Sequence, residues 1–318
     1  MKSIPDISVI IPNYNHERFL RKRIDSVLAQ SFQNFEIIIL DDCSSDNSRA
    51  IIETYRCNAK VSHIVYNNVN SGSTFVQWCK GLTLAIGKYI WIAESDDYAS
   101  TNFLEVLFAP FNIISGLVIS YCRSTDVDEN GNLLGLTLHA DKMDAIKWTN
   151  DYVATGISEL STYLKYRNTI PNASAVLFKK PADFERYLNT SMRYCGDWYF
   201  WQALLKDKGS KIAYSSQPLN FFRTHVSSTR SLELGSTAEK ELQRFGEYKT
   251  FVPKSFFNPF DQRFRWMMAE WIDRGVPELL KATHYYYYPL LHPALIARYY
   301  MYLIKNYFFP VKERQSND

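Results

Sequence analysis

The chain has 318 residues, 46% of them hydrophobic and 15% aromatic, enough for one large α/β core and an additional element of about a hundred residues. A formal net charge of +3, without a long basic run, argues against nucleic-acid binding through bulk electrostatics. No run reaches about 18 apolar residues, so we expect no membrane-spanning helix. Five cysteines without metal-ligand spacing, and no signal-peptide pattern, indicate a reducing cytoplasm.

Short β-branched runs alternate with longer helical patterns from residue 7 to about residue 124. This alternation is typical of βαβ units around a parallel sheet, and the continuous apolar character of the runs suits strands with helices on both faces. We predict strands at 7–11, 35–40, 61–66, 89–93 and 117–121, and helices that begin near Glu17, Asn47, Thr74 and Asn102.

The pattern changes after residue 121, where residues 126–136 indicate a hairpin and therefore a sheet that becomes mixed. Beyond about residue 237 the chain is mostly helical and aromatic, so we place a domain boundary between 1–236 and a helical extension at 237–318. In between, we predict helices at 158–166 and 198–205 and strands at 175–178 and 219–223.

Polar and acidic residues follow three of the predicted strands. Ligands of open parallel sheets bind beyond the carboxyl ends of the strands, so these side chains are expected to meet at one edge. A carboxylate cluster repels a diphosphate unless a hard divalent cation lies between them, which implies Mg²⁺ or Mn²⁺. The residues concerned are Pro12 to Asn15 after the first strand, Asp41 and Asp42 after the second, and Glu94 to Asp97 after the fourth.

Other readings of these residues stay open at this point. A single aspartate at a strand end is often a helix cap or turn former, and Asp42 can instead accept a hydrogen bond from a base or ribose. No G-x-G-x-x-G follows the first strand, and no G-x-x-x-x-G-K-[ST] occurs, which disfavours a dinucleotide dehydrogenase and a P-loop NTPase.

The chain resembles the large glycosyltransferase family 2, whose catalytic domain has the GT-A fold, a Rossmann-like and mostly parallel sheet with helices on both faces. The matching words span about residues 7–98 in order and at family-like spacing. They are ISVIIPNYNHERFLRKRIDSVLAQSFQNFEIIILDDCSSDNS, NSGS and GLTLAIGKYIWIAESDDY.

The resemblance implies a donor site in residues 1–98 and an acceptor-binding half in residues 99–236. Pro12 and Tyr14 are similar to the family residues beside the nucleoside base, and Asp42 to the residue that accepts a hydrogen bond from it.

Glu94, Ser95 and Asp96 resemble the acid-x-acid motif of the family. The resemblance turns Glu94 toward the ribose and makes Asp96 a metal ligand, with Asp97 as the alternative ligand.

Two departures from the family pattern stand out. Glu94 replaces the usual first aspartate, and Trp78 with Cys79 stand where many relatives carry Arg-Asn.

The catalytic base is expected outside these words, because inversion needs a group that takes the acceptor proton on the face opposite the leaving diphosphate. Asp197 follows a glycine and opens an apolar helix, as the general base of the family does; a helix cap is the alternative reading.

His225, close to Arg223, resembles a histidine near the donor phosphates and is a secondary metal ligand. Acceptor contacts are expected from Asn172, Ser174 and Trp198, although a polar loop and a helix core explain these residues as well.

The most consistent interpretation is an inverting, metal-dependent transferase that moves a sugar from a nucleotide-diphosphate donor, UDP by default, to a saccharide or lipid-linked acceptor in polysaccharide, O-antigen or glycolipid synthesis. A nucleotidyltransferase and a non-catalytic sugar-nucleotide binding protein are the alternatives. Basic and aromatic residues of the extension suit peripheral contact with the inner face of the cell membrane, or packing on the catalytic domain or on a second copy of the chain.

Overall fold

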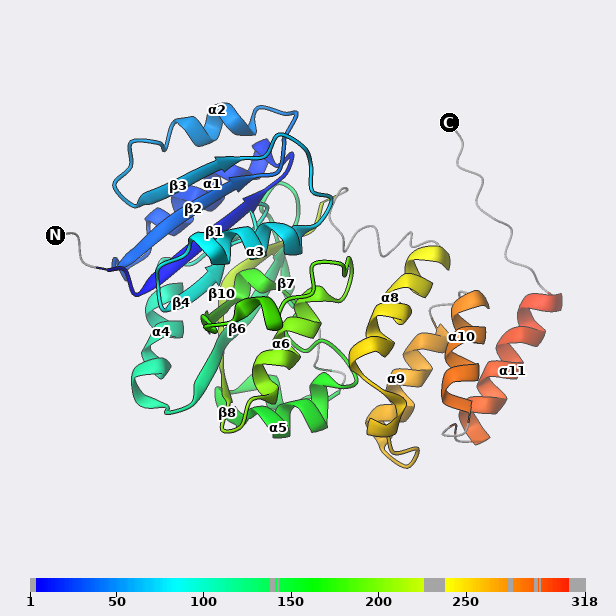
Figure 1. Ribbon diagram of the computed structural model, residues 1–318. Coiled ribbons are helices and arrows are strands. Elements are labelled where there is room, and N and C mark those ends of the chain that lie inside the picture. Colours follow the sequence, from blue (N-terminus) through cyan, green and yellow to red (C-terminus); the bar gives the residue numbers. More distant parts are fainter. Residues whose placement is uncertain are drawn as a thin grey trace. The chain divides into compact units, whose positions relative to one another are not determined.

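The computed structural model describes residues 4–137, 141, 143–225, 238–273, 277–288, 291 and 293–308. The chain divides into two compact units, one formed by residues 1–164 and 168–234 and the other by residues 165–167 and 235–318. Figure 1 shows strands and helices in the first unit and helices in the second. The position of the predicted boundary, near residue 237, lies outside the described residues.

Four parallel strands form the amino-terminal part of the sheet, in the order β3-β2-β1-β4. Every residue of β1 and β2 is buried, as the continuous apolar runs predicted for strands covered on both faces. The first four predicted strands are confirmed, with ends that differ by at most two residues, and the fifth, predicted at 117–121, is the longer strand at 117–127. The bounds of the first four are β1 (Ile7–Asn13), β2 (Phe35–Asp41), β3 (Val61–Tyr66) and β4 (Tyr89–Ile92).

Helices cover both faces of this part of the sheet (Figure 1). Helices α1, α2 and α4 share a core with alternate residues of β1, such as Val9. Helix α3 packs on the opposite face, where Gly81 lies against Ile10. The bounds are α1 (Glu17–Leu28), α2 (Ser48–Glu53), α3 (Thr74–Leu84) and α4 (Phe103–Ile113), so all four predicted helices are confirmed.

The remaining strands make the sheet mixed, as the hairpin at 126–136 indicated. The order continues β4-β9-β6-β10-β5, and β6 and β10 are parallel, whereas β9 is antiparallel to both of its neighbours. Strands β7 and β8 pair with β6 and β10 at the sides of this path. The bounds are β5 (Tyr98–Ala99), β6 (Leu117–Val127), β7 (Leu133–Leu136), β8 (Tyr152–Thr155), β9 (Val176–Lys179) and β10 (Lys211–Arg223), with helices α5 (Gly156–Glu159) and α6 (Gly196–Lys206).

Strand β10 is much longer than the predicted strand at 219–223. The register with β6 shifts between Ser215 and Pro218, where β10 is irregular. Proline has no N–H to donate to the hydrogen bonds between strands, so Pro218 suggests the end of a strand in the sequence. An irregular position in a strand accommodates it. The short strands β5 and β8 were also missed, and the helix predicted at 158–166 is α5 followed by a π-helical turn at Leu160–Leu164.

The pairing of β10 with β5 determines what lies at the end of β4. Phe221 is paired with Tyr98, and their rings stack with centroids 4.4 Å apart. Because β5 begins directly after the acidic run Glu94–Asp97, the end of β10 and the following His225 are brought to that run from far along the chain.

The described residues of the second unit include the α-helices α8 (Ala238–Phe251), α9 (Gln262–Asp273), α10 (Pro277–Tyr287) and α11 (Pro293–Phe308). Aromatic side chains such as Phe245, Tyr248 and Tyr287 fill its core. Across the described part of the chain, no helix has the length and apolarity needed to cross a bilayer.

Replacing Gly81 by alanine tests the contact between α3 and β1. The added Cβ would lie 2.4 Å from Ile10 Cγ2, and Ile10 is fully buried, so we expect G81A to lower the free energy of unfolding by about 1–3 kcal/mol in urea denaturation. Gly246→Ala in α8, where the added Cβ meets no atom within 4 Å, is the control and should be neutral or stabilising. If the losses in free energy of unfolding caused by G81A and by Ile10→Ala simply add in the double variant, this explanation is contradicted.

Candidate active site

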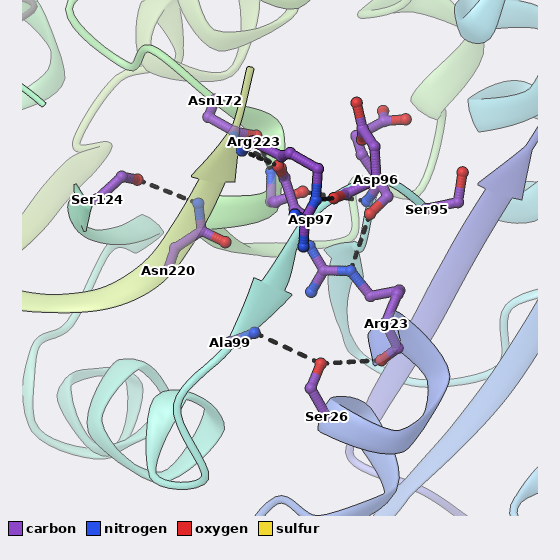
Figure 2. A network of polar contacts seen from close by, with 12 residues as sticks. Arg23, Ser26, Ser95, Asp96, Asp97, Ala99, Ser124, Asn172, Asn220 and Arg223 are labelled. Atoms are coloured by element: carbon purple, nitrogen blue, oxygen red, sulfur yellow. Dashed lines mark hydrogen bonds and ion pairs between the residues drawn. The ribbon is translucent and has the colours of Figure 1, made fainter. Parts of the chain in front are cut away.

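The acidic run Glu94–Asp97 follows β4 after Ala93, and Figure 2 shows the polar contacts of Asp96 and Asp97. Asp97 points into the protein, where its carboxylate accepts hydrogen bonds from Asn172 Nδ2 at 2.7 Å and from the backbone N–H of Arg223 at 2.9 Å. Its side chain is 2% exposed, against 18% for Asp96. Asp97 therefore holds the site together, and Asp96 is the more accessible of the two acids.

Arg23 of α1 is the buried counter-charge of this run. Its Nε donates to the carbonyl of Glu94 at 2.8 Å, and its Nη2 lies 3.9 Å from the Asp97 carboxylate. Burial lowers the pKa of Arg23 to about 10, which leaves the guanidinium charged at neutral pH. Sequence reasoning missed this residue, although a cation between Leu20 and Ile24 on the apolar face of a helix is a usable signal.

Asp96 faces two histidines. Its Oδ2 lies 3.1 Å from His225 Nε2, and the imidazoles of His16 and His225 are 5.3 Å apart and perpendicular. The ligand atoms of these three residues all lie within 4.8 Å of one another. One carboxylate oxygen and two imidazole nitrogens suit a divalent transition metal, so of the two ions that the sequence implied these residues fit Mn²⁺ better than Mg²⁺.

His16 is the second residue that sequence reasoning missed. It directly precedes α1, and its Nδ1 forms a 2.8 Å hydrogen bond with Ser95 Oγ. Burial lowers the pKa of His16, which favours the neutral imidazole that can bind a metal. Its place inside the matched word NYNHERF was the available signal, but the family resemblance gave this position no role.

The three acids do not share the same electrostatic state. Burial and the charge of Asp96 raise the pKa of Glu94 to about 8, and the same two causes raise the pKa of Asp97 to about 6. Burial also acts on Asp96, but its hydrogen bond with His225 and the electrostatic interaction with the imidazoles of His16 and His225 bring its pKa below the ordinary value. At neutral pH Asp96 and most of Asp97 are therefore ionised, whereas Glu94 is largely protonated, and Asp96 is the ionised acid beside the histidines.

Glu94 is held by Trp78, which is itself a departure from the family pattern. Trp78 Nε1 of α3 donates to Glu94 Oε1 at 2.9 Å, and the indole is almost completely buried. On the backbone side, Glu94 N–H donates to Ser174 Oγ at 3.1 Å. The glutamate in place of aspartate and the tryptophan in place of arginine are therefore partners in this chain.

The residues predicted to contact the acceptor have structural contacts instead. Ser174 is fully buried beneath Glu94, and Asn172 is bonded to Asp97. Trp198 is 9% exposed, and its Nε1 donates to the carbonyl of Leu164 at 2.6 Å. The acceptor role of these three side chains stays a prediction without support from this arrangement.

The ends of β1 and β2 are joined by a polar network. Asn13 Nδ2 donates to Asp41 and to Ser44, and Ser44 Oγ accepts from the N–H of Asn15. Asn15 has a positive φ of 55°, a conformation that asparagine tolerates better than most residues, and it turns the chain toward α1.

The residues predicted to contact the nucleoside base lie at this edge of the sheet, and their exposure differs. Tyr14 is 46% exposed, whereas Pro12 is buried in β1. The Asp42 carboxylate accepts from Asn67 Nδ2 and from the N–H and hydroxyl of Ser71, so it organises the loop that carries the NSGS word.

Asp197 lies in the first turn of α6, one residue after a glycine that packing requires. A Cβ on Gly196 would lie 2.5 Å from the ring of Phe75, which belongs to α3. Asp197 accepts from Asn168 Nδ2 at 2.9 Å and from the N–H of Trp198. The residue at the cap position is Cys195, so Asp197 is not the N-cap. Phe75, which packs on Gly196, lies one helical turn before Trp78 on α3, and Trp78 contacts Glu94.

Arg223, at the end of β10, supports the site through contacts with the backbone. Its guanidinium donates to the carbonyls of Asp96, Asp128 and Glu129, which ties the hairpin between β6 and β7 to the acidic run. Three backbone contacts and 3% exposure make it a brace for the site instead of a ligand for phosphate.

The Arg23–Asp97 pair gives a stability test. Asp97→Asn keeps the shape but leaves the guanidinium buried without its anion, so we expect a loss of about 3 kcal/mol or more in the free energy of unfolding. Arg23→Met combined with D97N should recover much of this loss in denaturant titrations. Glu53→Gln, in the exposed pair with Arg56, is the control and should leave stability nearly unchanged. A D97N protein as stable as the unchanged one would refute the role of Asp97.

Comparison with known proteins identifies the family of the chain. The model described as Glycosyl transferase family 2 matches residues 8–207. The glycosyltransferase TuaG of Bacillus subtilis is 33% identical over 149 residues, which span 46% of this chain and 58% of TuaG. An uncharacterized glycosyltransferase of Haemophilus influenzae is 28% identical over 255 residues, which span 80% of this chain and 94% of that protein.

Solved structures share the fold at low sequence identity. The structure of Staphylococcus aureus TarS 1–349 in complex with UDP-GlcNAc has a TM-score of 0.59 and 18% identity, and the match covers 95% of this chain and 89% of that one. The mannosyltransferase PcManGT of Pyrobaculum calidifontis, in complex with GDP-Man and Mn²⁺, has a TM-score of 0.54 and 13% identity, covering 98% and 77%. Since the family model matches more than half of its residues, the chain belongs to glycosyl transferase family 2 and has the GT-A fold.

Proposed function

We propose that the first unit is the catalytic domain of an inverting, metal-dependent glycosyltransferase that transfers a sugar from a nucleotide-diphosphate donor to an acceptor hydroxyl. The observation that carries the proposal is Asp96 beside His16 and His225, at the carboxyl end of the parallel strands. The products we propose are polysaccharide, O-antigen or glycolipid.

A divalent cation, Mn²⁺ or Mg²⁺, is part of this proposal. Asp96 and His225 would hold it, and when bound it would stabilise the departing nucleotide diphosphate as a Lewis acid. The PcManGT structure, which contains Mn²⁺, supports a metal in this fold. Asp97 was predicted as the alternative ligand, but its contacts with Asn172 and the Arg223 backbone favour a supporting role.

The donor is proposed to lie across the ends of β1, β2 and β4. Tyr14 is exposed beside the edge, Pro12 shapes the end of β1, and Asp42 would share its carboxylate between the base and Ser71. Glu94 would contact the ribose. UDP is our proposal for the nucleotide, and the complex of TarS with UDP-GlcNAc supports it, while GDP-Man in PcManGT is the alternative that a donor panel separates.

Asp197 is proposed as the general base that accepts the proton of the acceptor hydroxyl. It is half-buried in the first turn of α6, and Asn168 orients its carboxylate with a 2.9 Å hydrogen bond. The contact between Gly196 and Phe75 fixes that turn against α3, whose Trp78 holds Glu94. A carboxylate in such a fixed position suits proton abstraction.

Two alternatives predict different outcomes. A nucleotidyltransferase is expected to have a Gly-rich, basic loop after β1, where this chain has Asn13 to Glu17. A non-catalytic sugar-nucleotide binding protein would bind the donor with metal and show no turnover.

The second unit is proposed to contribute acceptor or membrane contact. Its exposed side chains include Tyr285 and Tyr288 at the end of α10 and Tyr300, Met301 and Ile304 on α11. Aromatic residues of this kind suit the interface of a bilayer, which would bring a lipid-linked acceptor to the enzyme. Peripheral membrane contact, a homo-oligomer and a cytoplasmic location all stay predictions.

A thermal-shift panel of nucleotide sugars, each with and without Mn²⁺, tests the donor proposal. We expect one donor to raise the midpoint of unfolding in the presence of metal, because a ligand at about 100 times its Kd adds about 2.7 kcal/mol of stability. UDP-sugars should give the largest shift. A protein that no nucleotide sugar stabilises, with or without metal, would contradict the proposed function.

Asp197→Asn tests the catalytic base. We expect turnover to fall by about 10²–10⁴-fold while donor binding, measured by the same thermal shift, is retained. Asp207→Asn, at the other end of α6 and bonded to Tyr187, is the matched control and should keep full turnover. Unchanged turnover in D197N would exclude this residue as the base.

A further inference from the structure

We propose that His16 is a third protein ligand of the divalent ion, and that its imidazole makes the site select Mn²⁺ over Mg²⁺. The inference deepens the proposed function and rests on it. His16 lies outside the acid-x-acid motif, and it adds to His225, the histidine that the sequence predicted as a ligand. The ligand atoms of His16, Asp96 and His225 lie within 4.8 Å of one another.

The backbone brings His16 to this point by a defined route. Asn15, with its positive φ of 55°, turns the chain between β1 and α1, and His16 occupies the first position before the helix. Its side chain makes no capping hydrogen bond, so it is not used to satisfy the helix terminus. It is directed to the acidic run of β4 instead, where it meets Ser95.

The contact with Ser95 sets the orientation of the ring. A 2.8 Å hydrogen bond joins His16 Nδ1 to Ser95 Oγ, and Ser95 is 2% exposed. When Nδ1 donates to the hydroxyl, the lone pair lies on Nε2, which is the tautomer of a metal-binding imidazole. Serine at the middle position of the motif thus fixes the histidine, and Asp96 is the next residue along the chain.

Packing holds the two imidazoles in a fixed arrangement. Their rings are perpendicular, with centroids 5.3 Å apart, and Phe19 lies against both, at 6.0 Å from His16 and 4.9 Å from His225. A preorganised pair of nitrogens binds an ion without the loss of side-chain freedom that a flexible ligand pays on binding.

The donor set predicts which ion binds. Two imidazoles and one carboxylate form the three-ligand face that leaves the other positions of the ion open, here for diphosphate oxygens and water. Mg²⁺ prefers oxygen ligands and loses its water reluctantly, whereas Mn²⁺ stands in the series of transition ions that accept imidazole. His16 should therefore raise the affinity for Mn²⁺ more than that for Mg²⁺.

The variant His16→Asn tests the proposal on the full chain. Asparagine keeps a hydrogen-bonding group near the Nδ1 position and is a preferred residue before a helix, so α1 should stay intact. We expect Mn²⁺ affinity, measured by calorimetry with UDP present, to weaken at least about tenfold, and Mg²⁺ affinity to change less. Electron spin-echo modulation of bound Mn²⁺ should show coupling to two imidazole nitrogens in the unchanged protein and to one in H16N.

His63→Asn is the matched control, because His63 on β3 also bonds a serine hydroxyl, that of Ser62, and lies outside the site. It should bind both ions like the unchanged protein. Mn²⁺ binding by H16N with unchanged affinity, unchanged preference over Mg²⁺ and two coupled nitrogens would overturn the role of His16 and leave the proposed function intact. Failure of the unchanged protein to bind Mn²⁺ and UDP together would instead count against the proposed function itself.

Discussion

The structure depends on the partners that offset the mutual repulsion of the carboxyl groups that follow β4. Three acids lie within four residues, and each has its own partner: Arg23 below Asp97, Trp78 beside Glu94, and the imidazole of His225 against Asp96. Without such partners, buried carboxylates of this density would repel one another strongly. The partners come from α1, α3 and the end of β10, so the architecture of the first unit can be understood as the arrangement that brings them to one point.

Periodicity in the sequence was sufficient for the amino-terminal fold. The strands from 7 to 66 and the helices near 17, 48, 74 and 103 are local patterns, in which buried runs and amphipathic faces follow from chemistry within a few residues. The short strands β5 and β8 and the first part of β10 were missed because they are defined by pairing with distant segments. Pro218 makes the middle of β10 resemble a loop, and only tertiary contact with β6 shows that the strand continues.

Residues of the candidate site could be predicted where they belong to a sequence motif. They could not be predicted where their role depends on a tertiary contact. Asp96 and His225 were named from the resemblance and lie together, while Asp97, the next residue after Asp96, points inward because Asn172 and the backbone of Arg223 donate hydrogen bonds to it. His16 and Arg23 had no motif role, and their importance appears only when α1 is packed beside β4. Ser174 and Trp198 illustrate the converse, since polar or aromatic character in a sequence does not reveal that a side chain is buried.

The Trp78–Glu94 contact has a consequence for exchanges at these two positions. The family resemblance expects arginine and aspartate at these positions, and each exchange alone would be unfavourable here. Aspartate is too short to reach the indole N–H, and arginine would remove the ring that packs on Phe200 and Trp201 and leave a cation in a buried position. The effects of exchanges at the two positions on stability should therefore be coupled, because either exchange alone removes the hydrogen bond that holds Glu94.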